Sequence, residues 1–153
     1  MRPDDPAALD VLRRSMVARI ATLSRHGRPS INPLYFISHN GHIWLGTVEW
    51  TLAARNVQAD SRVSVLFEVE RDPRSHRVLR MSGQASVRTE QTVQRSYALR
   101  VARKYLLTPG GIGNYVAHIR QFSAMHQYHA QAAEKGRSCV IEVTPQTAEW
   151  LEL

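Results

Sequence analysis

The sequence predicts an α+β fold in which six antiparallel strands close into a small β-barrel flanked by helices. Three observations predict this fold. Six segments alternate apolar with polar or small residues, turn residues separate them, and five of the six strands come before the main helical segments. Six such strands favour a barrel because a closed sheet has no unpaired edge. The length of 153 residues predicts a single domain over 1–153.

The first element is expected to be a short helix. Asp5 can serve as its N-cap, and Pro6 suits the first helical position. Leu9, Leu12 and Met16 then recur at helical spacing and predict one apolar face.

Three strands in a meander are expected next, over 17–24, 29–38 and 43–48. Gly27 supplies the first turn, and the Asn40-Gly41 pair is the strongest short hairpin pattern in the sequence.

The spacing then predicts a helix of two turns over 52–59, which Asp60-Ser61 ends, and strands over 62–69 and 78–89. Gly83 interrupts the second of these strands, which indicates a bulge or a bend of the barrel.

The later part of the chain predicts two helices and a last strand. Thr89 can cap the first helix, whose inward face would hold Val93, Tyr97, Val101 and Tyr105. A second helix is expected over 114–134, and the last strand begins at 138 and ends in a tail around Trp150.

Composition and charge exclude several classes of protein. The net charge of +7 invites a nucleic-acid interpretation, but the arginines are scattered and no basic block is interleaved with aromatic residues. A basic groove for a small phosphorylated or polycarboxylate ligand explains the charge as well. No apolar run approaches the length of a membrane span, and the N-terminus has no apolar signal region. We therefore expect no nucleic acid, no membrane and a cytoplasmic protein.

Few residues have a spacing that suggests metal or thiol chemistry. Cys139 is the only cysteine, and its apolar surroundings predict a buried structural thiol. On the expected helix 114–134, His118 and His129 would lie too far apart to share one ion. His126 and His129 could share one, but the sequence shows no third ligand, so we expect no metal and leave a haem ligand as a weaker alternative.

From Ala21 to Val65, the chain resembles the pyridoxamine 5'-phosphate oxidase-like FMN-binding split barrels and their relatives that use the deazaflavin F420. The resemblance rests on the pattern "ATL…GRP…N…YF…G.IWL.T……RN…D.RVSV", followed by the glycine of "SGQASV" and the late strand. It implies a six-stranded split barrel, a homodimer, and a cofactor in a groove between the two subunits.

The resemblance also implies which residues contact the cofactor. Asn32, Pro33 and Leu34 would lie along the edge of the flavin ring, and Thr47, Thr51 and Arg55 would face its phosphate. Trp50 and Tyr35 could stack on a ring or pack in the barrel wall or the dimer interface. Asn56 matches a family asparagine expected to be structural. The residues give no catalytic assignment.

The sequence departs from the family at Ala53, where members that bind a phosphorylated flavin often carry lysine. Alanine cannot donate to a phosphate, and Glu49 adds a nearby negative charge. A charge-assisted contact to phosphate contributes about 1.5 to 3 kcal/mol, so its loss weakens binding unless another cation substitutes. The candidate substitutes are Arg55, Arg28, Arg80 and a Lys104 from the partner subunit.

The sequence therefore predicts an FMN- or F420-dependent oxidoreductase that acts on a small organic molecule and holds its cofactor at a homodimer interface. The alternative is a non-catalytic protein that binds a flavin, F420 or haem on the same scaffold. Since such a cofactor carries out the redox chemistry itself, the lack of a visible catalytic triad fits both hypotheses. The substrate cannot be chosen from these residues, and vitamin B6 synthesis is a minor possibility.

Overall fold

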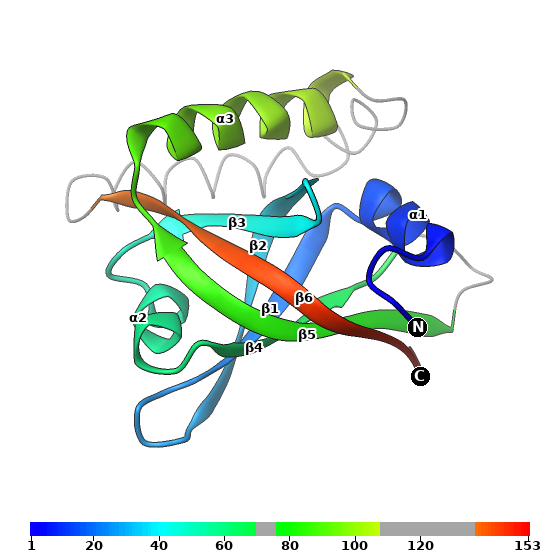
Figure 1. The fold of residues 1–153 in the computed structure, drawn as a ribbon, viewed down its shortest axis with the longest axis horizontal. Coiled ribbons are helices and arrows are strands. Elements are labelled where there is room, and N and C mark those ends of the chain that lie inside the picture. Colours follow the sequence, from blue (N-terminus) through cyan, green and yellow to red (C-terminus); the bar gives the residue numbers. More distant parts are fainter. Residues whose placement is uncertain (70–75, 108–136) are drawn as a thin grey trace.

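The computed structural model describes residues 1–69, 76–107 and 137–153, and Figure 1 shows their arrangement. In chain order the elements are α1 (Pro6–Arg14), β1 (Val17–Leu23), β2 (Pro29–His39), β3 (His42–Val48), α2 (Leu52–Ala59), β4 (Arg62–Phe67), β5 (Arg77–Arg88), α3 (Gln91–Ala102), the π-helix η1 (Arg103–Leu107) and β6 (Ser138–Glu152).

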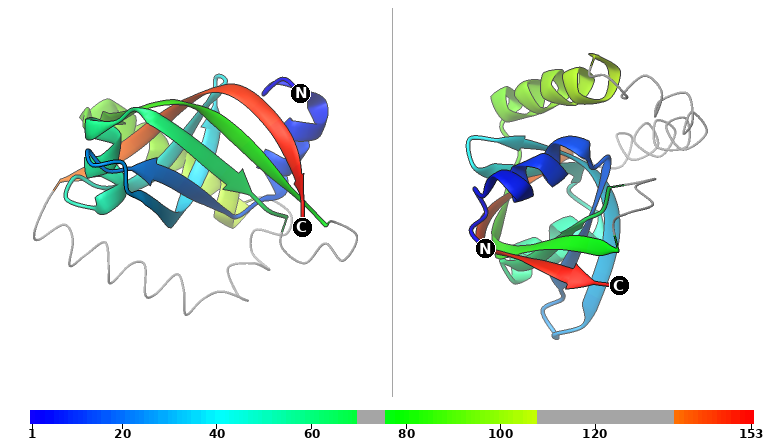
Figure 2. Two further views of the ribbon diagram at one scale, coloured as in Figure 1. Left: turned by 90° about the horizontal axis from the view of Figure 1, so that it is seen from below. Right: turned by 90° about the vertical axis from the view of Figure 1, so that its right-hand side faces the viewer.

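The strands form a closed antiparallel barrel in the order β1-β2-β3-β6-β5-β4, with β4 returning to β1. The two views in Figure 2 show α1 and α2 at opposite ends of the barrel and α3 along its side. The predicted α+β fold with six strands and flanking helices is confirmed.

Glycine is required at the β2–β3 turn and at the bulge. Asn40 and Gly41 have φ angles of 50° and 77°, the left-handed conformation that a tight β2–β3 hairpin needs. At Gly83, a Cβ atom would lie 2.1 Å from the carbonyl oxygen of Thr144 on β6. The register shifts between Ser82 and Gly83, so the predicted bulge is confirmed, and glycine allows the two backbones to approach there.

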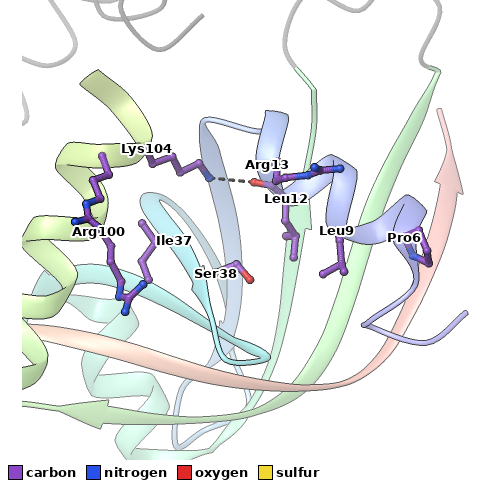
Figure 3. Close-up of a pocket in the computed structure, with 9 residues that line it drawn as sticks. Pro6, Leu9, Leu12, Arg13, Ile37, Ser38, Arg100 and Lys104 are labelled. Atoms are coloured by element: carbon purple, nitrogen blue, oxygen red, sulfur yellow. Dashed lines mark hydrogen bonds between the residues drawn. The ribbon is translucent and has the colours of Figure 1, made fainter. Parts of the chain in front are cut away.

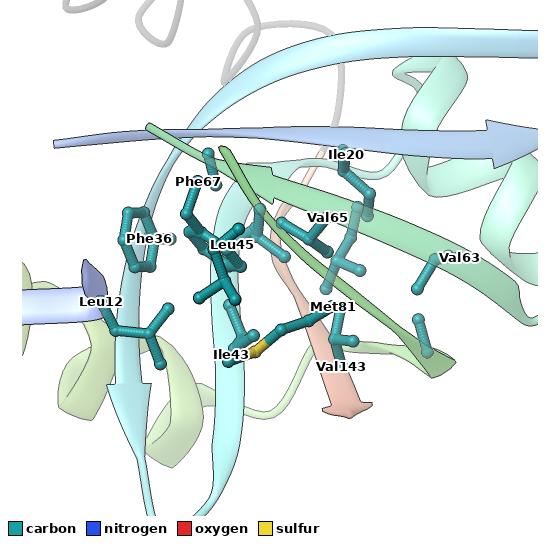
Figure 4. Close-up of a cluster of buried hydrophobic side chains, with 14 of the residues drawn as sticks. Leu12, Ile20, Phe36, Ile43, Leu45, Val63, Val65, Phe67, Met81 and Val143 are labelled. Atoms are coloured by element: carbon teal, nitrogen blue, oxygen red, sulfur yellow. The ribbon is translucent and has the colours of Figure 1, made fainter. Parts of the chain in front are cut away.

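The barrel interior is filled by inward side chains from all six strands. Phe36 packs against Phe67 with ring centroids 4.9 Å apart, and Leu45, Met81 and Ile141 are fully buried around them (Figure 4). The α1 helix adds Ala8, Val11 and Leu12 to this core, and α2 adds Ala53 and Val57. Each end of the barrel is thus closed by a short helix.

The α3 helix covers the outside of the barrel. A second apolar cluster joins its Val93, Tyr97 and Val101 to Ile37 of β2, Trp44 of β3 and Val140 of β6. The predicted inward face of this helix is therefore confirmed as far as Val101.

Several predicted boundaries were wrong. The first helix ends at Arg14, so Met16 is not part of it, and Ser15 is its C-cap. The N-cap of α3 is Glu90 rather than Thr89, and the Glu90 carboxylate accepts hydrogen bonds from Arg88 instead of capping the helix.

Two other expectations also need correction. Tyr105 lies in the π-helix that follows α3. Trp150 is not in a tail but pairs with Leu79 inside β6, which runs for 15 residues.

The remaining expectations concern the burial of Cys139, membrane-spanning helices and the helix expected over 114–134. Cys139 is buried at 1% exposure, as predicted, and burial raises the pKa of its thiol to about 12. Among the described helices, none has both the length and the apolar character that a bilayer crossing needs. The expected helix 114–134, with His118, His126 and His129, lies outside the described residues.

Candidate functional site at the split of the barrel

The barrel opens between β2 and β3. Their ladder pairs only four residues on each strand, from His39↔His42 to Phe36↔Leu45. Beyond Phe36 and Leu45, the described strands pair with other neighbours. The rest of β2, back to Pro29, pairs with β1, and the rest of β3, on to Val48, pairs with β6. The two strands therefore diverge, and their ends form the two sides of a split.

Tyr97 of α3 lies where the ladder stops. If the register continued, Tyr35 would face Gly46, but the Tyr97 hydroxyl bridges them instead. It accepts a hydrogen bond from the Gly46 N–H at 3.0 Å and donates to the Tyr35 carbonyl oxygen at 3.2 Å. A Cβ atom on residue 46 would lie 2.4 Å from this hydroxyl, so glycine is needed at that position. The tyrosine satisfies both backbone groups while it separates the strands.

The predicted ring-edge residues lie on the β2 side of the split and alternate in direction. Asn32 pairs with Ile20 and Leu34 with Ala18, and both partners are fully buried in the core. Because paired residues of antiparallel strands point to the same face, Asn32 and Leu34 face the interior and Pro33 faces outward.

Asn32 carries a buried acceptor with no partner. Its side-chain Oδ1 is fully shielded from solvent and accepts no hydrogen bond from the described residues. An unsatisfied buried polar atom costs about 1 to 3 kcal/mol, so such atoms are rare in native structures. This atom is the strongest indication of a ligand-binding role among the predicted site residues.

The structure brings Thr47 and Thr51 together on the β3 side. Their Oγ1 atoms are 3.0 Å apart, and Thr51 donates to the Val48 carbonyl oxygen at 2.9 Å. Because that donation uses the only proton of the Thr51 hydroxyl, Thr47 must donate to Thr51. Thr51 is also the N-cap of α2 and accepts from the Ala54 N–H. Both hydroxyl protons are therefore used within the chain.

Behind these threonines, Asn56 connects α2 to the barrel. Its Nδ2 donates to Thr22 Oγ1 at 3.0 Å and to Ser30 Oγ at 3.1 Å, and these two hydroxyls also bond to each other. Asn56 is 4% exposed, and it holds α2 against the ends of β1 and β2. These contacts agree with the structural role expected for it.

The candidate phosphate-binding cations differ in availability. Arg55 and Arg28 are exposed, and both lie at the α2 end. Arg55 comes directly before Asn56, and Arg28 comes two residues before Ser30, which accepts a hydrogen bond from Asn56. Arg80 instead pairs with Glu149, and Lys104 donates to the Leu12 carbonyl oxygen at the other end. Arg55 and Arg28 are therefore better placed than the other two candidates.

Ala53 itself is part of the core. It is 2% exposed and packs in the main hydrophobic cluster. A longer side chain at this position would have to leave the interior to reach solvent, so this chain uses position 53 for packing.

Exposed apolar residues surround the split. Trp50 is 41% exposed and Leu52 45%, both between β3 and the first turn of α2, while Ile31 on β2 is 61% exposed. Tyr35 instead packs edge-on against Tyr105 with ring centroids 5.1 Å apart.

The role of Tyr97 in the split was not predicted. Gly46, inside the strand 43–48, was the sign of it, because a glycine within a strand often marks the close approach of another group. In the described parts of the chain, no group of three or more His, Cys, Asp or Glu residues could hold a metal ion.

A family model described as pyridoxamine 5'-phosphate oxidase matches residues 4–151. The chain belongs to this family. The match spans nearly the whole chain and agrees with the split-barrel architecture, as the resemblance implied. No curated protein sequence matches the chain significantly.

Solved structures of other proteins share this fold. A conserved hypothetical protein of Mycobacterium tuberculosis has a TM-score of 0.69 at 17% identity, covering 97% of this chain and 84% of that one. An F420 reductase has a TM-score of 0.61 at 19% identity, covering 92% and 94%. A candidate pyridoxamine 5'-phosphate oxidase of Listeria innocua has a TM-score of 0.64 at 13% identity, covering 95% of both chains. At these identities the likeness concerns the fold.

Proposed function

We propose that this family member is an oxidoreductase that uses FMN or F420 to reduce or oxidise a small organic molecule. The proposal includes a cytoplasmic homodimer in which the split of each subunit forms part of the cofactor site. The family match and the F420 reductase of similar fold favour a flavin-type cofactor.

The unpartnered Oδ1 of Asn32 is the observation that carries this proposal. It is a buried acceptor on one side of the split, with Leu34 on the same face as an apolar neighbour. Flavin and deazaflavin rings are flat and largely apolar and carry an N–H donor on their pyrimidine edge. A ring N–H that reached Asn32 would satisfy the acceptor, so the residues present fit this class of group.

The phosphate end of the cofactor would be held by charge rather than by hydroxyl groups. The protons of Thr47 and Thr51 are committed inside the chain, whereas Arg55 and Arg28 are exposed at the α2 end. Guanidinium groups form paired hydrogen bonds with phosphate oxygens, so two arginines can replace the family lysine that Ala53 lacks.

When bound, the cofactor supplies hydride or electron transfer. The chain's own residues bind and orient it: Asn32 fixes the ring edge, Leu34 provides apolar contact, and the arginines hold the phosphate. Trp50, which is 41% exposed between β3 and α2, would cover the site and exclude water.

A second copy of the chain explains the exposed apolar residues at the split. Ile31, Trp50 and Leu52 are large side chains with 41% to 61% of their surface exposed. Apolar and aromatic residues of this kind are enriched at the centres of protein interfaces. A twofold dimer through this face would cover them and complete the cofactor groove.

Equilibrium titration of the purified protein with FMN, F420 and haem tests the proposal. We expect FMN or F420 to bind, and Arg55→Ala to weaken binding by about tenfold, as loss of one charge-assisted contact predicts. Arg77→Ala is the matched control, because Arg77 is an exposed arginine at the first position of β5, where, among the described residues, it pairs with Glu152 of β6 and not with α2 or its neighbours. If neither flavin-type cofactor binds, or if both variants behave alike, the cofactor assignment fails.

The non-catalytic alternative is motivated by Ala53, which is buried in the core and cannot contact a phosphate, and by the negative charge of Glu49 four residues earlier in the sequence. Stopped-flow mixing of the cofactor-loaded dimer with a panel of small electron acceptors separates the two functions. Oxidation of the reduced cofactor that is faster with the protein than without it supports an enzyme, whereas binding without acceleration supports a cofactor-binding protein.

A further inference from the structure

A pocket of about 820 Å³ lies between α1 and the junction of α3 with the π-helix, and β2 forms its base (Figure 3). It is at the α1 end of the barrel, whereas Thr51 and Arg55 belong to the α2 end. Its volume is in the range of sites that enclose small organic ligands, which is about 300 to 1,000 Å³. The proposed cofactor site does not use it.

The walls of the pocket are of two kinds. Leu9 and Leu12 of α1 face Ile37 of β2 and provide an apolar lining. Leu9 is 42% exposed, whereas Ala8, Val11 and Leu12 of the same helix are buried in the core. An apolar side chain that borders a pocket rather than the core can contact the apolar part of a ligand.

Four cations line the same pocket. Arg100 of α3 and Arg103 and Lys104 of the π-helix lie on one side, and Arg13 of α1 lies on the other. None of the nine described lining residues is acidic. Arg13 pairs with Asp10 at 3.3 Å, and both side chains are exposed, so this ion pair neutralises little of the charge of Arg13.

The pocket therefore has a positive potential on an apolar floor. A cleft lined by charges of one sign concentrates their field, since the low-dielectric walls screen it poorly. The charge of Arg100 also acts outside the pocket, since burial and, after it, the positive charge of Arg100 lower the pKa of His39.

Lys104 adds to this potential when its amine is protonated. Its Nζ lies 3.4 Å from the centroid of the Phe36 ring and donates to the Leu12 carbonyl oxygen at 3.1 Å. The carbonyl oxygen and the ring face both favour the ammonium, while burial lowers the pKa of Lys104 to about 7. An anion in the pocket would favour the charged form further.

We propose that this pocket binds an amphiphilic organic anion, with an aliphatic or aromatic body on Leu9, Leu12 and Ile37 and a single carboxylate or sulfonate beside Arg100 and Arg103. The charge complements the four cations, and the body covers Leu9, which is 42% exposed beside the buried Leu12 and Ile37. The site is independent of the cofactor.

A pair of fluorescent dyes tests the inference on the purified protein. The probe 8-anilino-1-naphthalenesulfonate carries one negative charge, and N-phenyl-1-naphthylamine has the same rings without it. We expect the anionic dye to bind at least about tenfold more tightly than the neutral one, and its affinity to fall with added salt. Equal affinities for the two dyes, or no binding of the anionic dye, would overturn the proposal.

Variants locate the site. Arg100→Ala and Arg103→Ala should each weaken binding of the anionic dye about fivefold to tenfold and leave the neutral dye unchanged. Arg95→Ala is the matched control, since Arg95 is exposed on the same helix outside the pocket. Arg55→Ala controls for binding at the split. If the two control variants weaken the anionic dye as much as Arg100→Ala does, the site is not this pocket.

A variant that fills the pocket without changing its charge provides a second test. Ser38 is exposed on β2 and lines the pocket, and a strand tolerates tryptophan well. Ser38→Trp should block both dyes without changing the cations, while the near-UV circular dichroism confirms that the variant is folded. A folded Ser38→Trp variant that still binds the anionic dye with wild-type affinity contradicts the proposal.

Discussion

Each end of the barrel is closed by a short helix, but different interactions hold the two ends together. At the α2 end, polar side chains form two hydrogen-bonded groups. Asn56 donates to Thr22 and Ser30, and Thr47 donates to Thr51. At the α1 end, apolar side chains close the barrel, and the ammonium of Lys104 lies over the Phe36 ring. The α2 end thus contains a buried hydrogen-bond network, whereas the α1 end contains a charge whose contribution to stability depends on pH.

The largest expected effect concerns that charge. Burial lowers the pKa of Lys104 to about 7, below its unfolded value near 10.4, so between these pH values the unfolded chain binds more protons. The contribution of Lys104 to stability therefore rises from pH 7 to pH 10 and is flat below pH 7. We expect a gain of roughly 2 to 4 kcal/mol relative to Lys104→Met, because the carbonyl and ring contacts offset part of the shift.

Urea unfolding of both proteins across this pH range measures the gain. Lys104→Arg is the matched control, because arginine stays charged at every pH in the range. Parallel stability curves for wild type and Lys104→Met would show that the ammonium is not desolvated at the α1 end, and the contrast between the ends would disappear.

The second prediction concerns the boundary between the ends, where Tyr97 separates β2 from β3. Gly46→Ala places a Cβ atom 2.4 Å from the Tyr97 hydroxyl, so the tyrosine or the strand must move. Overpacking of this kind costs about 1 to 3 kcal/mol, measurable by urea unfolding. Adding Tyr97→Leu should recover part of the loss, since it removes the clashing atoms. Fully additive losses in the double variant would mean that the two residues do not interact.

The third prediction addresses the satisfied network. Asn56→Ala removes two hydrogen bonds from a buried site and should destabilise the protein by about 2 kcal/mol in thermal or urea unfolding. Gln58→Ala, on the exposed face of the same helix, should change stability by less than about 0.5 kcal/mol. Equal effects of the two changes would indicate that the helix surface, rather than the network, holds α2 in place.

The smallest expected effect is a gain in stability at the α2 end. Asn32→Leu removes a buried acceptor without a partner and should stabilise the cofactor-free protein by about 1 kcal/mol while it weakens FMN or F420 binding. Ser15→Ala removes another such atom at the α1 end, so it should raise stability without affecting the cofactor. If Asn32→Leu destabilises the free protein, the Asn32 amide has a structural role instead.

The sequence predicted most of the fold because the relevant patterns are local. Alternation located all six strands, and the Asn40-Gly41 pair and Gly83 located a hairpin and the bulge. Helix ends were predicted less well, since Arg88 competes for the Glu90 carboxylate and the chain changes from an α-helix to a π-helix before Tyr105. Such competition depends on neighbours that sequence spacing does not reveal.

The candidate site could be predicted only in part. The resemblance predicted that Asn32, Thr47, Thr51 and Arg55 contact a cofactor. The structure puts Asn32 on β2, Thr47 on β3 and Arg55 on the exposed face of α2, and only the structure shows that the protons of Thr47 and Thr51 are used internally. The bridging role of Tyr97 and the cationic pocket around Lys104 were missed. Both depend on contacts between elements more than 50 residues apart in the sequence.

The position of β6 has a consequence for how the protein folds. This strand joins β3 to β5, and its pairing of Cys139 with Thr47 connects residues 92 positions apart. A contact of such long range has a high entropic cost before it contributes any stability. We therefore expect the sheet of β1 to β5 to assemble first and to present two open edges until β6 pairs with both. Closure should be the slow step of folding, on the scale of milliseconds to seconds, and the open-edged intermediate should be the species most prone to aggregation.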